Sequence, residues 1–225
     1  MSIRYNPAVM ASRREPPDSL DYFPTPPWAT RALFVHVLRE LGLTPNIESA
    51  WEPACGEGHM AAVMAEWARH VVASDVFDYG YGRGVVDFLD PAAGGVFPPC
   101  DWIITNPPFV AGHAFATLAL ERAVDGVALL VRSVWTEGVD RWRYLFEPRP
   151  PAAIAQFVER VPMVKGRWDP SAKTATAYCW VVWLKHAPPG AGTKFVWIPP
   201  CRAELTRPDD IARFAPLAPA PLLEG

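Results

Sequence analysis

The sequence predicts an α/β fold with a doubly wound, mostly parallel sheet of seven strands and a C-terminal antiparallel hairpin strand. Three observations support this prediction. Short apolar runs alternate along the chain with segments whose apolar residues repeat at helical spacing. A glycine-containing turn at residues 53–58 joins the first run to a helical segment, as at the nucleotide-binding start of such folds. Residues 127–131 are all apolar, which is typical of a strand buried on both faces.

The individual elements follow from local signals. A helix is expected at residues 27–42, because a proline stands near its start, a glycine at its end, and apolar residues repeat at helical spacing between them. A strand at 47–52 precedes the glycine turn, and a helical pattern follows the turn up to Trp67. The remaining expected elements are strands at 70–74, 101–105, 127–131, 154–161 and 177–185, a short turn or strand at 85–89, and a helix at 112–124.

Composition divides the chain into three parts. Residues 1–20 are predicted to be a flexible lead, and residues 21–185 to form one α/β domain. Residues 186–225 contain 8 prolines and are predicted to be a proline-rich tail, in which 196–198 is the segment that could dock on the core.

Several classes of protein are excluded by composition. Half of the residues are hydrophobic, which argues against disorder, and no apolar run approaches the roughly 20 residues needed to cross a bilayer. The N-terminus lacks the apolar core of a secretory signal. The four cysteines are scattered, and the five histidines show no metal-ligand spacing. We therefore expect a cytoplasmic protein with reduced thiols, no membrane segment and no metal site.

The most informative segment is Asn106-Pro107-Pro108-Phe109, which follows an apolar run of strand character. The prolines cannot donate to a sheet ladder, so they end the strand at the sheet edge where ligands bind in open α/β folds. There the Asn106 side chain and the Pro107 carbonyl can accept hydrogen bonds from an amino group on a planar system, and Phe109 can cover its face. A strand end followed by an ordinary turn is the structural alternative.

A cofactor site is predicted at the preceding glycine turn. Gly56 and Gly58 let the backbone approach a ligand at a helix N-terminus, and Asp75 follows the second strand about where such folds place a carboxylate for ribose hydroxyls. The same glycine pattern also fits a nicotinamide dinucleotide enzyme, which stays open at this point. Glu52, at the end of the first strand, favours a ligand with a cationic amino group over a pyrophosphate.

Taken together, these motifs resemble those of Rossmann-like methyltransferases that use S-adenosylmethionine, and among them the site-specific, adenine-specific N6 DNA methyltransferases. The segment 106–109 matches their catalytic signature, and 52–58 matches their methionine-side cofactor loop. Tyr22 to Pro27 resembles their Thr-Pro segment, and the order of the three motifs resembles the gamma-type arrangement. The resemblance covers roughly residues 20–185.

The resemblance implies S-adenosyl-L-methionine as the cofactor and DNA as the partner. The cofactor-binding residues that it implies are Thr25, Pro26, Glu52, Pro53, Ala54, Gly56, Gly58, Asp75, Val76, Asp87, Phe88 and Asn106. Gamma-type enzymes with defined target sequences usually have a long recognition domain after the catalytic part. This chain has little room for one, so we expect any sequence specificity to come from short loops or another chain.

Substrate contacts are predicted in the second half of the chain. Residues 1–131 contain 8 Lys or Arg and 15 Asp or Glu, whereas residues 132–225 contain 13 Lys or Arg and 9 Asp or Glu. The second part of the chain therefore carries the positive charge. This excess fits either a side that faces phosphates or an ordinary solvated face. Arg132 and Trp135 could line the base pocket, although packing of Trp142 under the sheet is the favoured interpretation of that segment. Cations alternate with an aromatic residue in the loop that contains Lys165, Arg167, Trp168 and Lys173, as in nucleic-acid contacts or in an ordinary surface loop.

The chemistry that the resemblance implies is methyl transfer to the N6 amino group of adenine, either flipped out of a duplex or single-stranded. Hydrogen bonds to Asn106 and Pro107 would stabilise the positive charge that develops on the nitrogen. Stacking on Phe109 would contribute ~1–3 kcal/mol. No general base is needed, because the product loses its proton after transfer. Cytosine-N4 enzymes commonly have Ser in place of the Asn, so Asn106 favours adenine.

Other functions share parts of this pattern. Methyltransferases that act on amino groups of RNA or on a protein glutamine amide also grip a planar nitrogen, and the Thr-Pro segment favours the DNA group over them. A nicotinamide oxidoreductase is a further alternative. An inactive nucleic-acid-binding module is disfavoured, because Glu52, Gly56, Gly58, Asp75 and Asn106 are all present.

Overall fold

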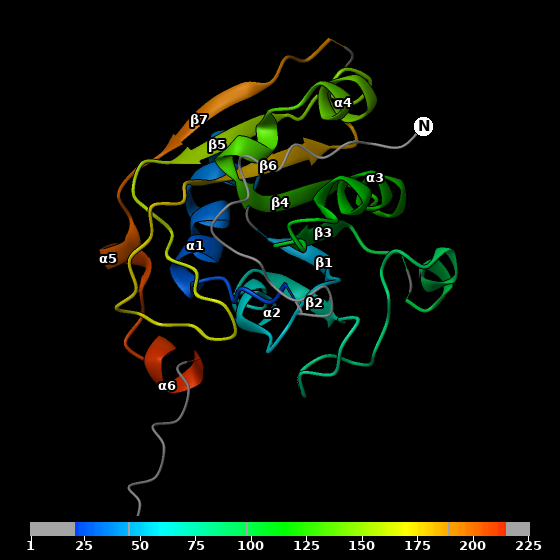
Figure 1. Cartoon of the computed structure of the whole chain (residues 1–225). Helices are drawn as coiled ribbons and strands as arrows, with labels where there is room; N and C mark the ends of the chain where they lie inside the picture. The colour runs from blue at the N-terminus through cyan, green and yellow to red at the C-terminus, as the bar shows by residue number, and fades with distance from the viewer. Residues whose placement is uncertain (1–20, 45, 98, 189, 215–225) are drawn as a thin grey trace, which may run out of the picture.

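The structure is a computed structural model, and it describes residues 21–214 except 45, 98 and 189. One seven-stranded sheet runs through the molecule in the order β2-β1-β3-β4-β6-β5-β7, with helices on both faces (Figure 1). The strands are β1 Ile47–Glu52, β2 Ala68–Ala73, β3 Trp102–Thr105, β4 Gly126–Arg132, β5 Ala153–Phe157, β6 Tyr178–Leu184 and β7 Lys194–Ile198. The predicted fold class is confirmed.

Helical segments connect these strands. The α-helices are α1 Pro27–Ala32, α2 His59–Met64, α3 Gly112–Arg122, α4 Val139–Arg141, α5 Arg202–Leu205 and α6 Asp210–Phe214. Two π-helical segments, η2 Leu33–Leu38 and η5 Trp142–Phe146, continue α1 and α4, and two 3₁₀ turns lie at η3 Pro91–Gly95 and η4 Ser133–Thr136. None of the helices formed by residues 21–214 is long and apolar enough to span a bilayer.

Strand direction explains where a ligand site can form. Strands β2, β1, β3 and β4 are mutually parallel, whereas β6 is antiparallel to both β4 and β5. The carboxyl ends of β1, β2, β3 and β4 therefore meet at one edge of the sheet, which is the ligand-binding edge in open α/β folds. The motifs predicted from sequence follow three of these strand ends: Glu52, Asp75 and Asn106.

The segment 85–89, predicted as a short turn or strand, is a turn that forms one isolated bridge, between Val85 and Asp75. The seventh strand is β7, which lies in the predicted tail and pairs in parallel with β5. The segment 196–198 therefore docks as part of the sheet. The predicted flexible lead of residues 1–20 and the last residues, 215–225, lie outside the described residues.

Side chains alternate between two hydrophobic cores, one on each face of the sheet. Ile104, Leu130 and Trp180 face α1, η2 and α2, where they meet Trp28, Phe34 and Met64 among others. Ile103, Leu129 and Val181 face α3, where they meet Phe115 and Leu120. Because successive residues of a strand point to opposite faces, a fully apolar strand such as β4 serves both cores.

A buried ion cluster attaches the C-terminal helices to the first helix. The Arg31 guanidinium, 1% exposed, donates to both carboxylate oxygens of Asp210 at 2.6 and 2.7 Å and to the Leu205 carbonyl at 2.8 Å. It also donates to Glu66 just after α2, at 2.8 and 3.0 Å. One cation thus joins α1, α2, α5 and α6, although the chain separates Arg31 from Asp210 by 179 residues.

Arg31→Leu is expected to lower the free energy of unfolding by about 3–5 kcal/mol, because it leaves the buried carboxylate of Asp210 without its cation. Arg69→Leu is the matched control. Arg69 pairs with Glu48 at 3.4 Å, with 72% and 62% of the two side chains exposed, so the control should change stability by about 1 kcal/mol or less. Urea unfolding of both variants tests this, and equal losses would contradict the role of the cluster.

Candidate functional site

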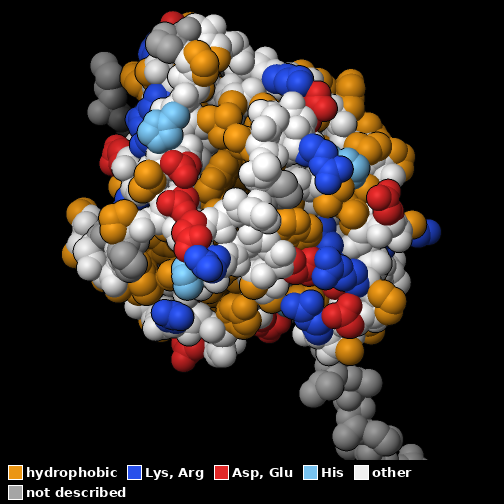
Figure 2. All heavy atoms as spheres, turned by 180° about the vertical axis from the view of Figure 1, so that it is seen from behind, with side chains coloured by type: hydrophobic (Ala, Val, Ile, Leu, Met, Phe, Trp, Pro, Cys, Tyr) orange, Lys and Arg blue, Asp and Glu red, His pale blue; other side chains and the backbone are white. Residues whose placement is uncertain are grey.

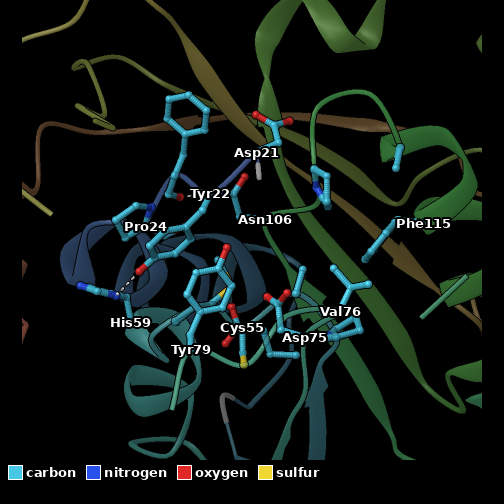
Figure 3. Close-up of a pocket in the computed structure, with 18 of the residues that line it drawn as sticks. Asp21, Tyr22, Pro24, Cys55, His59, Asp75, Val76, Tyr79, Asn106 and Phe115 are labelled. Carbon is cyan, nitrogen blue, oxygen red and sulfur yellow. Dashed lines mark hydrogen bonds between the residues drawn. The ribbon is translucent and has the colours of Figure 1, made fainter. Parts of the chain in front are cut away.

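A pocket of about 180 Å³ lies at the carboxyl edge of the parallel strands. Its lining includes the ends of β1, β2 and β3, the segment 21–25 that precedes α1, and residues of the loops after β2 (Figure 3). Glu52, Asp75 and Asn106, predicted separately from the sequence, all line it. The topology therefore brings the glycine-turn motif and the Asn-Pro-Pro-Phe motif into one site.

The Asn106 side chain is clamped by the N-terminal segment. Its amide nitrogen donates to the Phe23 carbonyl at 2.9 Å and to the Thr25 hydroxyl at 3.2 Å. A carbonyl oxygen can only accept, so the Phe23 contact fixes which end of the amide is the nitrogen. Asn106 Oδ1 is consequently buried, and no residue in the described part of the chain hydrogen-bonds it. The clamp leaves an oriented acceptor at the end of β3.

Glu52 presents a second oriented oxygen. It is the last residue of β1 and only 2% exposed, and its Oε2 atom has no hydrogen-bond partner among the described residues. Burial raises the pKa of this carboxyl well above its ordinary value, the Ala61 backbone N–H lowers it, and the charge of Asp75 raises it further. A buried carboxylate without a cation is costly, so this position suits a ligand that brings a positive charge.

The glycine turn is held open by its backbone conformation and by Asp75. Gly56 and Gly58 have positive φ angles of 51° and 82°, which favour glycine. The Gly56 N–H donates to Asp75 Oδ2 at 2.8 Å, and the Phe77 N–H donates to Oδ1 at 3.2 Å. Burial raises the pKa of Asp75, and these N–H groups oppose the rise. Asp75 therefore organises the turn as well as lining the pocket.

Aromatic rings cover the two glycines. A Cβ atom at Gly56 would lie 2.2 Å from the Tyr22 ring, and one at Gly58 would lie 2.4 Å from the Tyr81 ring. Tyr22 also packs on Tyr79 with ring centroids 4.6 Å apart, and its hydroxyl lies 3.4 Å from His59 Nδ1 (Figure 3). Burial raises the pKa of Tyr79 to about 12 and the pKa of Tyr22 further, so both phenols are neutral at physiological pH. The rings form an aromatic cover over the glycine turn.

Phe109 follows the pocket-lining Pro108 and does not itself line the pocket. Its ring centroid is 5.0 Å from that of Phe23, and the guanidinium carbon of Arg132 lies 3.7 Å from it. The Phe109 N–H donates to Asp21 at 2.5 Å, which ties the Asn-Pro-Pro-Phe motif to the N-terminal segment a second time. Pro107 is buried and Pro108 lines the pocket, as expected for residues that end β3.

Most of the predicted cofactor-side residues lie where the motifs place them. Thr25, Pro53, Ala54, Val76 and Asp87 line the pocket, and Pro26 precedes α1 as a buried residue.

Three of the predicted residues lie next to the pocket and do not line it: Pro26, Gly56 and Gly58. Phe88 does not line it either, and its predicted side-chain contact with a cofactor is wrong for this structure. Its side chain is 1% exposed and packs against Trp51 and Phe115 in the core on the α3 side. The next residue, Leu89, lines the pocket instead.

The predicted substrate side needs three corrections. Trp135 is 9% exposed, packs against Phe146 and Gly112, and does not line the pocket. Trp142, which was expected to pack under the sheet, is 54% exposed. Trp168 is 4% exposed and packs on Phe214, so its ring offers no stacking face in this structure.

The loop that contains Trp168 nevertheless lies beside the site. The Gly166 N–H donates to the Tyr22 carbonyl at 2.9 Å, and Met163 Sδ lies 3.7 Å from the Asn106 amide nitrogen. Arg167 and Lys173 are exposed, and Lys165 is partly buried. The loop thus supports the N-terminal segment through Gly166 and the Asn106 amide through Met163.

Several site residues were not predicted. Asp21, His59, Tyr79 and Met163 contact the site from segments that the motifs do not include. Alternation of tyrosine with glycine at residues 79–82, directly after the Asp75 loop, is the one sequence signal that could have identified the aromatic cover. The other contacts join residues that are far apart in the chain.

Neither the surface charge nor the metal-binding side chains identify a ligand. On the face opposite the view of Figure 1, basic, acidic and hydrophobic side chains are interspersed, so that face presents no continuous basic surface (Figure 2). Within residues 21–214, no group of three or more His, Cys, Asp or Glu side chains could hold a metal ion.

Comparison with known proteins identifies the fold. The chain matches a candidate RNA methyltransferase from Pyrococcus horikoshii with a TM-score of 0.55 and 15% identity, over 76% of this chain and 90% of that one. It matches the modification subunit of a candidate type I restriction enzyme from Vibrio vulnificus with a TM-score of 0.52 and 14% identity. This match covers 85% of this chain and 51% of the other. No protein-family model and no curated protein sequence matches. The chain therefore has the fold of methyltransferases.

Glu52→Gln is expected to raise stability at neutral pH. Because the pKa of Glu52 is raised in the folded state above its ordinary value of 4.5, its stabilising contribution is present below that pH and is lost as pH rises. The amide has no charge to bury, so the variant should unfold at a higher temperature than the parent at pH 7, and the difference should shrink toward pH 4. Melting curves across this range test it, and a pH-independent difference would contradict it.

Proposed function

We propose that this chain is an S-adenosylmethionine-dependent methyltransferase that transfers a methyl group to the N6 amino group of adenine in DNA. The observation that carries the proposal is the buried, unpartnered Oδ1 atom of Asn106, held in place by Phe23 and Thr25. It lines the same pocket as Glu52, whose Oε2 atom is also unpartnered among the described residues. The fold shared with methyltransferases supports the reaction class.

The residues at the glycine turn fit S-adenosylmethionine. Glu52 would bind the ammonium of the methionine part, Asp75 the ribose hydroxyls, and Val76, Asp87 and Leu89 would surround the adenine. The bound cofactor supplies a methyl group on a positively charged sulfur. A nicotinamide dinucleotide fits less well, because its pyrophosphate would meet the buried carboxyl of Glu52.

Cofactor binding requires the aromatic cover to move. The pocket volume of about 180 Å³ lies below the roughly 300–1,000 Å³ that is usual for ligand pockets. Tyr81 is 45% exposed and belongs to a glycine-rich loop, so its ring can turn outward at little cost in packing. Tyr22 is held more firmly by Tyr79 and by the N-terminal segment.

At the other end of the site, Asn106 Oδ1 and the Pro107 carbonyl would accept the two N–H groups of the target amine. These hydrogen bonds favour a pyramidal nitrogen whose lone pair is available for attack, and they stabilise the charge that develops on it. Phe109 would stack on the base. A base inside a duplex cannot reach these groups, so the adenine must be flipped out or single-stranded.

The proposal is tested with methyl-labelled S-adenosylmethionine and separate DNA, RNA and protein substrates, followed by nucleoside and amino-acid analysis. Label in N6-methyldeoxyadenosine is the expected result. Label in methylated ribonucleosides or in methylglutamine would retain the reaction class and replace the substrate. Absence of any transfer by a protein that binds the cofactor would overturn the proposal.

Asn106→Ala is expected to leave cofactor affinity within about threefold and to lower kcat by about 10²–10³-fold, the effect of removing one preorganised transition-state hydrogen-bonding group. Thr25→Val is the matched control, because it removes one of the acceptors that hold the amide nitrogen and keeps Oδ1. It should reduce kcat far less. Single-turnover kinetics and cofactor titration measure both effects, and comparable losses in the two variants would assign Asn106 a structural role only.

Gly56→Ala is expected to weaken cofactor binding at least about tenfold, because a side chain at a positive φ strains the turn and the new methyl group projects into the space that Tyr22 fills in the free protein and that the cofactor would fill when bound. Gly42→Ala is the control: its φ of 75° imposes similar strain, yet nothing lies within 4 Å of its Cβ position. The control should lose about 1–2 kcal/mol of stability with unchanged cofactor affinity. Isothermal titration of both variants would show whether the two glycines differ.

A further inference from the structure

Arg132 covers the ring on which the target base would stack. It is the last residue of β4, next to β3 in the sheet, and its guanidinium carbon lies 3.7 Å from the centroid of the Phe109 ring. Its Nε atom is buried and has no hydrogen-bond partner in the described part of the chain. The guanidinium is planar and cationic, and it stacks on aromatic faces as a nucleobase does.

Phe23 and Arg132 both pack against the Phe109 ring, and Arg132 is the one whose side chain can move away from it. Phe23 is 7% exposed, and its carbonyl holds the Asn106 amide, so moving it would disorder the catalytic acceptor. Arg132 has a long side chain that is only partly buried, and stacking on Phe109 satisfies none of its N–H groups. A base that takes its place on Phe109 therefore displaces the guanidinium and leaves the Asn106 clamp intact.

The displaced guanidinium needs an anionic partner. An arginine beside a bound nucleotide can form paired hydrogen bonds with a backbone phosphate, which are stronger than contacts with water or with an aromatic ring. A substrate that lacks a phosphate would displace the guanidinium without providing an anionic hydrogen-bond partner for it. This difference can discriminate between substrates that present the same amino group.

We propose that Arg132 is a specificity-determining residue that covers Phe109 in the free protein and binds a backbone phosphate when the target base occupies the ring. The proposal rests on the function proposed above and deepens it, because it restricts the substrate to polynucleotides. A free nucleoside or a glutamine side chain would uncover Phe109 without gaining the phosphate contact.

Three variants separate the parts of this role. Arg132→Gln keeps a planar group that can rest on Phe109 and removes the charge, whereas Arg132→Lys keeps the charge and removes the planar stack. Arg69→Gln is the matched control for lost charge, because Arg69 is exposed and lies at the amino-terminal edge of the sheet, opposite the pocket. All three are made in the full chain.

The first measurement is binding of a fluorescently labelled, adenine-containing single-stranded DNA at several salt concentrations. Arg132→Gln should lower the slope of log affinity against log salt by about 0.7, the value expected for one lost phosphate contact on a single strand. Arg132→Lys and Arg69→Gln should keep the parent slope. A structural role for Arg132 would weaken binding without changing this slope.

The second measurement compares methyl transfer to the oligonucleotide with transfer to deoxyadenosine at a high concentration. In Arg132→Gln, kcat/KM for the oligonucleotide should fall about 10–100-fold, the range for one charge-assisted hydrogen bond, and kcat/KM for deoxyadenosine should change less than about threefold. Equal losses on both substrates, or an unchanged salt slope, would overturn the proposal.

The two proposals can fail separately. If the parent protein binds the oligonucleotide, Arg132→Gln lowers the salt slope as expected, and the parent transfers no methyl group, then the proposed function fails and the phosphate contact stands. If the parent methylates deoxyadenosine and does not bind the oligonucleotide, the role of Arg132 fails. Cofactor affinity should be the same in all variants, because Arg132 does not line the cofactor pocket.

Discussion

The hydrogen bonds between the Asn106 amide nitrogen and the segment 23–25 are the constraint on which the site depends. They join the end of β3 to residues that precede it by about 80 positions in the chain. They also fix the direction in which the amide oxygen, Oδ1, points. A free asparagine would alternate between donor and acceptor orientations in the pocket. The clamp removes this freedom, so the oxygen is organised as an acceptor before any ligand arrives, and no reorganisation is needed during the reaction.

The same edge of the sheet concentrates polar groups that oppose folding. Glu52 and Asp75 lie at the ends of adjacent strands, and burial raises the pKa of both carboxyl groups. Hydrophobic packing on both faces of the sheet, together with the Arg31 cluster, offsets this cost elsewhere in the molecule. The Arg31 cluster is paired throughout, whereas Glu52 keeps an unpartnered oxygen among the described residues, and this contrast makes the pocket the candidate ligand site.

Sequence patterns were sufficient where the signal is local. The glycine turn, the end of β3 and the apolar strand β4 were predicted because each combines residue type with short-range spacing. Whether 85–89 or 194–198 supplies the seventh strand was left open by the sequence, because both segments are short, and pairing with β5 decides for 194–198. Phe88 was misassigned, because Asp87 and Leu89 on either side of it line the pocket while its own side chain packs in the core. The Arg31–Asp210 pair and the tyrosine contacts join distant segments, and no local pattern reports them.

In the free protein, planar side chains cover both halves of the site, and a ligand would have to displace them. Tyr22 and Tyr81 lie on the glycine backbone, where a cofactor would contact it, and the planar cation of Arg132 lies on Phe109. Each cover shields apolar or backbone surface that would otherwise meet water, so the free protein is stabilised by contacts that a ligand must replace. The Asn106 clamp lies between the two covers and belongs to neither. Tyr81 and Arg132 make no hydrogen bond of the clamp, so either side chain can move while the acceptor stays in place.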